Sequence, residues 1–217
     1  TVGGRRVQSG LYRVTYIGNE DTSPAQSTPG GDVARKHRQA LESLLQADAT
    51  DATTRQLDQA WHSLGSNDAG VRHAARVVLE KQPVANWSGR LAQESNPMRA
   101  TAAAIALARA DGANSASAVL RKIISFAPAS FDNHQLRLDA IRAITLAFTR
   151  GGEPTSDLKV DLITWLDNIY PARTPEENRD LSALMAFLQA PSAVEKGMAL
   201  LVEASGQEEQ IGYALNL

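Results

Sequence analysis

The histidines are the residues that most directly suggest chemistry, because imidazole nitrogens bind metal ions. Two histidines four residues apart on a helix share one face and can bind a single zinc ion. No such pair occurs in this chain, each histidine falls in a different predicted helix, and no cysteine is present to add a thiolate ligand. We therefore predict neither a metal site nor another cofactor in this segment. The four histidines are His37, His62, His73 and His134.

Two pairs of adjacent glutamates could support general acid–base catalysis. Both pairs, Glu176-Glu177 and Glu208-Glu209, fall in the first turn of a predicted helix. The helix dipole and the free backbone amides favour carboxylates there, so we interpret both pairs as helix-capping residues. Ser88-Gly89 lacks the flanking residues of a nucleophile elbow. The sequence assigns no catalytic residue, and we predict that this chain is not an enzyme.

Arginines recur at intervals that are typical of helical repeats. The pattern apolar-Arg-x-x-Ala surrounds Arg72 and Arg137, a looser version surrounds Arg99, and only the arginine is kept at Arg179. Asp68 supplies a carboxylate one turn before Arg72. We favour a structural interpretation, in which these arginines form an internal ladder with turn carboxylates or with the carbonyl groups at helix C-termini. The alternative is a row of arginines on a concave surface that binds an acidic partner.

The segments that carry these residues have the period of amphipathic helices. Glycine or proline ends many of them, as at Gly65, Pro83, Gly112 and Pro128, and Gly151-Gly152 closes a long one. The order of the segments predicts stacked helical hairpins. We expect helices over residues 33–46, 54–64, 68–81, 84–94, 97–110, 115–126, 132–148, 158–169 and 175–188, followed by two more that begin after Ser192 and Ser205.

Capping boxes define the helix starts in the second half of the chain. Thr174-Pro175 combines an N-cap with a proline at the first helical position, and Glu177 can return to the cap amide. The same logic places caps at three other positions and predicts two apolar faces near the C-terminus. The caps are Asp132 with Gln135, Ser192 with Glu195 and Ser205 with Glu208, and the buried faces comprise Val194, Met198 and Leu201, then Ile211 and Leu215.

Residues 1–31 differ in character from residues 32–217. Residues 11–17 alternate between apolar and polar side chains and are rich in β-formers, which predicts one strand. Residues 18–31 are rich in Ser, Thr, Pro and Gly, as in a flexible linker. A lone strand is unstable, so we expect it to complete a sheet elsewhere. We expect the natural chain to be longer at both ends.

The composition favours a helical protein and limits the classes of partner. The 217 residues are 43% hydrophobic but only 5% aromatic, and the apolar segments contain many alanines. A net charge of −2 gives no general attraction to nucleic acid, and we predict none as a partner. The basic run Arg35-Lys36-His37-Arg38 surrounds most of a helix and is interpreted as a solvated helix start. No segment is long and apolar enough to predict a membrane span.

The run Asp68-Ala69-Gly70-Val71-Arg72-His73-Ala74-Ala75 resembles the second-helix signature of HEAT repeats. In those repeats an aspartate in the turn and an arginine in the helix build a polar ladder. The resemblance covers residues 32–217. It implies an all-α fold, an α-solenoid of about five HEAT-like hairpins behind the N-terminal strand and linker.

Two short segments resemble a family of large modular bacterial proteins. Residues 9–16 are similar to the closing strand of a propeller like that of quinoprotein sugar dehydrogenases, and residues 207–215 are similar to a late helical motif of the same family. In that family a helical segment follows the propeller and often precedes a c-type cytochrome domain. The resemblance implies a periplasmic or secreted location and a connector between these domains. The haem-attachment residues are absent here, so no redox role is assigned to any residue of this chain.

Three functions remain open from the sequence. We favour a non-catalytic scaffold or protein-interaction module that connects domains within a larger multidomain protein. It could instead form a structural part of a dehydrogenase-like, cytochrome c-containing oxidoreductase, or act as an independent peptide-binding adaptor. Its partner is a protein in each case, either neighbouring domains of the same chain or a separate molecule.

Overall fold

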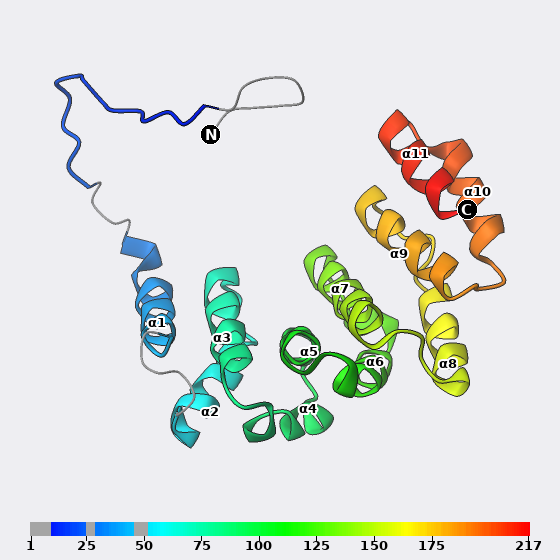
Figure 1. Ribbon diagram of the computed structural model, residues 1–217, viewed down its shortest axis with the longest axis horizontal. Coiled ribbons are helices and arrows are strands. Elements are labelled where there is room, and N and C mark those ends of the chain that lie inside the picture. The colour runs from blue at the N-terminus through cyan, green and yellow to red at the C-terminus, as the bar shows by residue number, and fades with distance from the viewer. Residues whose placement is uncertain (1–9, 25–28, 46–51) are drawn as a thin grey trace. The chain divides into compact units, whose positions relative to one another are not determined.

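The computed structural model describes residues 10–24, 29–45 and 52–217. Within these residues it contains helices and no strand, which confirms the prediction of an all-α chain (Figure 1). The chain divides into two units, Thr1–Asp32 and Val33–Leu217. The division falls one residue beyond the predicted linker.

The described part of the first unit is extended and open to solvent. Leu11, Val14 and Ile17 have exposed fractions of 88%, 96% and 94%. Residues 11–17 contain no strand, so the strand predicted there is not confirmed. A strand needs a partner for its backbone amides and carbonyl groups, and residues 11–24 form no ladder with another described segment.

The second unit is a succession of helices (Figure 1). Short 3-10 turns precede α1, α4, α6 and α7. The α-helices are α1 (Asp32–Ser43), α2 (Thr54–Ser63), α3 (Ala69–Lys81), α4 (Gly89–Gln93), α5 (Pro97–Asp111), α6 (Ala116–Ile124), α7 (His134–Gly151), α8 (Ser156–Asp167), α9 (Pro175–Phe187), α10 (Ala193–Glu203) and α11 (Gln207–Asn216).

The bounds of these helices agree with the predicted bounds to within a few residues, except that one predicted helix is split in two. The helix expected over residues 84–94 is split into a 3-10 turn, Val84–Asn86, and the short helix α4. The break is at Trp87, whose φ of −140° is not helical and whose side chain is only 1% exposed. The chain leaves the helical path there and buries the indole ring.

Short polar side chains begin most of the longer helices. Asp68 accepts a hydrogen bond from the amide of Val71, and Asn96 caps α5 in the same way. The cap predicted at Asp132 is wrong by one residue: Asn133 Oδ1 accepts from the amide of Leu136 at 2.9 Å. Aspartate and asparagine are nearly equal as N-caps, so residue type alone could not choose between these neighbours.

Two rows of helices run through the second unit. In one row α3 contacts α5, α5 contacts α7 and α7 contacts α9; in the other, α4 contacts α6 and α6 contacts α8 (Figure 1). Helix α5 lies in the centre of the first row. Fully buried alanines at Ala100, Ala103, Ala104, Ala106 and Ala108 let α3, α6 and α7 approach its backbone closely.

Tryptophans fill the core at three separate places. Trp61 in α2 and Trp165 in α8 are 6% and 7% exposed. The indole of Trp165 also donates a hydrogen bond to the carbonyl of Phe126 and meets the ring of Phe131 edge-on. Each tryptophan therefore fixes a different turn between helices.

The last two helices turn a different face inward from the one predicted. Val194 and Met198 are 61% and 47% exposed, and α10 buries Ala193 and Gly197 instead. Ser192 is the N-cap residue of α10, as predicted, but it forms no capping box, because its hydroxyl donates to Asp167 Oδ1 and makes no side-chain hydrogen bond to the helix. Small residues allow α10 to pack closely on its neighbours, so the larger apolar side chains face outward.

The final helix repeats this inversion. Ile211 and Leu215, predicted as buried, are 52% and 82% exposed, and Tyr213 is the buried residue of α11. Ser205 does not cap the helix, since the N-cap is Gly206 and makes no side-chain hydrogen bond. The phenol of Tyr213 offers more apolar surface to α9 and α10 than the smaller aliphatic side chains do.

Candidate functional site

Arg72 and Arg137 stabilise the turns that precede their own helices. The Arg72 guanidinium donates to the carbonyl of Ser66 at 2.7 Å, and that of Arg137 donates to the carbonyl of Phe131 at 3.1 Å. Each arginine lies four residues after its N-cap and reaches back six residues. The two arginines thus occupy equivalent positions, and the carbonyl groups that accept from them lie in the preceding turns rather than at the predicted helix C-termini.

Arg99 lies one residue earlier in its helix and binds a carboxylate instead. Its guanidinium is 3.2 Å from Glu94, which is 8% exposed. Glu94 also accepts from the indole of Trp61 at 2.9 Å and from the amide of Asn96 at 2.9 Å. Burial of Glu94 acts to raise its pKa, but the hydrogen bonds from Asn96, Trp61 and Arg99 together lower the pKa below the usual glutamate value.

In α9 the equivalent position is held by Asn178 rather than by Arg179. The Asn178 amide donates to the carbonyl of Ala172 at 3.1 Å, and its oxygen accepts from the amide of Ala172 at 2.6 Å. Arg179 is largely exposed, and its ion-pair partner among the residues that the structure describes is its neighbour Asp180, at 3.3 Å. Counting four residues from the N-cap Thr174 would have identified Asn178 in the sequence.

Glu177 joins α7 to α9 through a buried carboxylate. Its side chain is 1% exposed and accepts from Arg137 Nε at 2.8 Å, with His134 Nδ1 at 2.9 Å. Thr174 caps the amide of Glu177 as predicted. The carboxylate, however, does not return to the cap residue, so the predicted capping box is only half formed. The carboxylate binds His134 and Arg137 of α7 instead of the backbone amide of the cap residue.

A groove lies across α3, α5 and α7, three consecutive helices of the first row. Its volume is about 510 Å³. Of the predicted arginines only Arg72 lines it. Arg99, Arg137 and Arg179 lie elsewhere, and Asp68 is occupied as the cap of α3. Four arginines, one aspartate and a histidine are among the lining residues: Arg72, His73, Arg76, Arg109, Asp139 and Arg142.

The arginines of this groove, here called the arginine groove, differ in how they are held. Glu80, with a side chain 14% exposed, is 3.0 Å from Arg76 and 2.9 Å from Arg109, so one carboxylate fixes guanidinium groups from two helices. Arg142 is exposed and has no hydrogen-bond or ion-pair partner among the described residues. Asp139 accepts from the side-chain amide of Gln135 at 3.0 Å.

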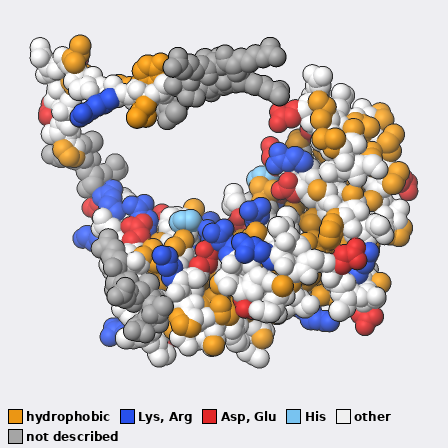
Figure 2. Space-filling view, viewed as in Figure 1, with side chains coloured by type: hydrophobic (Ala, Val, Ile, Leu, Met, Phe, Trp, Pro, Cys, Tyr) orange, Lys and Arg blue, Asp and Glu red, His pale blue; other side chains and the backbone are white. Residues whose placement is uncertain are grey.

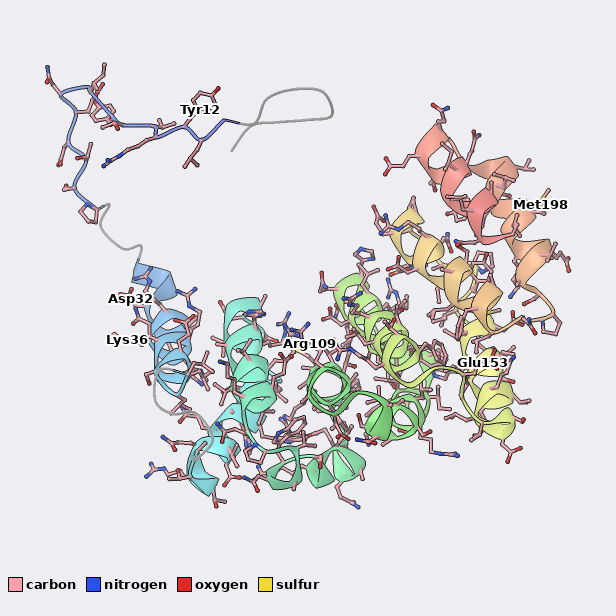
Figure 3. All side chains as sticks on the ribbon, viewed as in Figure 1. Tyr12, Asp32, Lys36, Arg109, Glu153 and Met198 are labelled. Carbon is pink, nitrogen blue, oxygen red and sulfur yellow. The ribbon has the colours of Figure 1, made fainter. Side chains whose placement is uncertain are left out.

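Apolar side chains form part of the same surface. Ile105 and Leu146 line the arginine groove and are 9% and 8% exposed, and Ala102 lies beside them. Figure 2 shows basic side chains gathered over α3, α5 and α7. Figure 3 shows Arg109 on the side of α5 that faces the space between α3 and α7. The groove therefore presents guanidinium donors next to apolar surface.

Arg76, Arg109 and Arg142 were not among the residues predicted from the sequence. Arg76 follows Arg72 by one helical turn, a spacing visible in the sequence. The other two come from separate helices, and only the packing of α3, α5 and α7 brings them together. Periodicity within one helix cannot reveal such a cluster.

The described residues contain no group of three or more acidic or histidine side chains that could hold a metal ion. None of the described helices is long and apolar enough to cross a membrane. No protein-family model, curated protein or solved structure matches the chain. Any role of the arginine groove must therefore be inferred from the geometry of the groove itself.

Proposed function

We propose that this chain is a non-catalytic α-solenoid of HEAT-like hairpins that acts as a protein-interaction module, with the arginine groove as its binding surface. The row of contacts from α3 to α9 supports the solenoid, because each helix contacts the next one in order. The observation that carries the binding role is the guanidinium of Arg142, which has no partner in the described part of the chain, beside the Glu80-bound pair Arg76 and Arg109.

A photo-crosslinking residue at position 142 tests this proposal. The matched control places the same residue at Arg121, which is exposed on α6 and lies outside the arginine groove. We expect a protein crosslink from position 142 in an extract of the source cells, and much less from position 121. Mass spectrometry then identifies the crosslinked peptide. Equal crosslinking at both positions, or none at position 142, would contradict the proposal.

A further inference from the structure

We propose that the arginine groove binds an extended protein segment in which acidic and apolar side chains alternate. This inference rests on the proposed function and specifies the chemistry of the partner. Four arginines and one aspartate give the lining an excess of positive charge. Carboxylates complement this charge, and the small exposed parts of Ile105 and Leu146, 9% and 8% of these residues, add apolar surface for the side chains between the carboxylates.

Arg109 and Arg142 are the donors that we assign to the partner. Glu80 Oε1 lies 2.9 Å from Nε of Arg109, and no hydrogen bond joins the two terminal nitrogens of Arg109 to another described residue. None of the guanidinium nitrogens of Arg142 has a partner among the described residues. A guanidinium edge with two parallel donors matches the two oxygens of a carboxylate. The two arginines can therefore each bind one acidic side chain.

Glu80 also prepares the groove for binding. Glu80 contacts Arg76 and Arg109 together, and it thereby restricts both arginine side chains, which would otherwise sample many rotamers. His73 Nδ1 lies 3.1 Å from Arg76 Nη2 and further fixes that guanidinium. Less conformational entropy is then lost when a partner binds, so the affinity for a matching segment increases.

The same features favour a protein segment over nucleic acid. A nucleic-acid surface needs many unpaired cations along a phosphate backbone. Here Glu80 neutralises part of the charge, Asp139 lies on the lining itself, and the whole chain has a net charge of −2. Apolar lining residues add nothing to phosphate binding, but they do increase the affinity for a peptide that carries leucine or a similar side chain.

Fluorescence anisotropy with a short labelled peptide of alternating glutamate and leucine tests the inference. A peptide with glutamine in place of glutamate and an oligothymidylate of similar length serve as comparison probes. We expect Arg142→Ala and Arg109→Ala each to weaken binding of the acidic peptide by about tenfold. Arg121→Ala is the matched control and should leave binding unchanged. Circular dichroism checks that each variant is folded, which is expected for Arg142→Ala because this side chain is exposed.

Three results would overturn the inference: equal binding of the glutamine peptide, equal loss in Arg121→Ala, or Arg142-dependent binding of oligothymidylate without binding of the acidic peptide. Its failure is distinguishable from failure of the proposed function. A protein crosslink at position 142 without binding of the acidic peptide would retain the interaction module and reject this partner chemistry. Absence of both would reject the two together.

Discussion

At the scale of single residues, three carboxylates organise the arginines of the helical unit. Glu94, Glu177 and Glu80 each bind an arginine from another helix or turn, and Glu94 and Glu177 are also nearly inaccessible to solvent. A buried carboxylate is costly unless every strong acceptor site is used. These residues therefore specify which helices meet as well as contributing hydrogen bonds.

Removal of the Glu177 carboxylate should destabilise the protein strongly. Glu177→Ala leaves the Nε donor of Arg137 without its acceptor in a site where the carboxylate was 1% exposed. We expect a loss of about 3 kcal/mol in the free energy of unfolding, measured by urea denaturation. The neighbouring Glu176 is exposed, so Glu176→Ala should cost about 0.5 kcal/mol or less. Equal effects of the two substitutions would contradict the structural role of Glu177.

Glu94 should make the stability depend on pH in the acidic range. Its pKa in the folded state is below the usual value, because hydrogen bonds from Asn96, Trp61 and Arg99 outweigh its burial. Its stabilising contribution is then complete above the unfolded-state pKa and is lost as the pH falls through the folded-state pKa. Glu94→Gln should flatten the decrease in the urea midpoint as the pH falls below about 5, toward and through the lower pKa of the folded state. Parallel curves for both proteins would refute this assignment, and Glu176→Gln is the control.

At the scale of elements, the helix starts are the most predictable feature of this chain. Asn or Asp before an apolar stripe located α3, α5 and α7 to within one or two residues, because the cap bond is local in sequence. The faces of α10 and α11 were not predictable in the same way. Apolar residues surround much of each helix, so the buried face depends on which neighbour the helix meets.

The candidate site was less predictable than the fold for a related reason. Arg72 was visible as part of a repeated pattern, and it does line the arginine groove. Arg109 and Arg142 join it only because α3, α5 and α7 lie side by side. Sequence spacing reports neighbours within a helix, whereas this site depends on contacts between helices that are far apart in the chain.

The contact between α6 and α7 can be tested with a single added methyl group. A Cβ at Gly151, the last residue of α7, would meet the Cβ of Ala116. Gly151→Ala should therefore lower stability by about 1 kcal/mol although alanine is the better helix former. Gly89 begins α4 with nothing within 4 Å of an added Cβ, so Gly89→Ala should be neutral or stabilising by up to about 1 kcal/mol. Thermal unfolding of both variants would show the difference in sign.

At the scale of the molecule, the two units have different kinds of sequence and burial. The described apolar side chains of the first unit, such as Leu11 and Val14, are almost fully exposed, whereas the second unit has a continuous buried core. Burial of apolar surface is the main source of folding free energy. The helical unit therefore has the contacts needed to fold on its own.

Deletion of residues 1–31 should leave the helical unit intact. The division between units at Asp32 and the exposure of Leu11, Val14 and Ile17 motivate this expectation. The far-ultraviolet circular dichroism spectrum per helical residue and the urea midpoint should both match those of the full chain. A marked loss of helical signal would show that the first unit is required for folding.

The positions of the tryptophans have a consequence for spectroscopy. Trp61, Trp87 and Trp165 are buried in separate parts of the helical unit, and their indole nitrogens have different surroundings: a carboxylate for Trp61 and a backbone carbonyl for Trp165, with no partner for Trp87 among the described residues. The intrinsic fluorescence is thus a sum of three local signals. In variants that keep one tryptophan at a time, the fluorescence reports on one region of the helical unit. Comparison of their unfolding curves can show where along the helices unfolding begins.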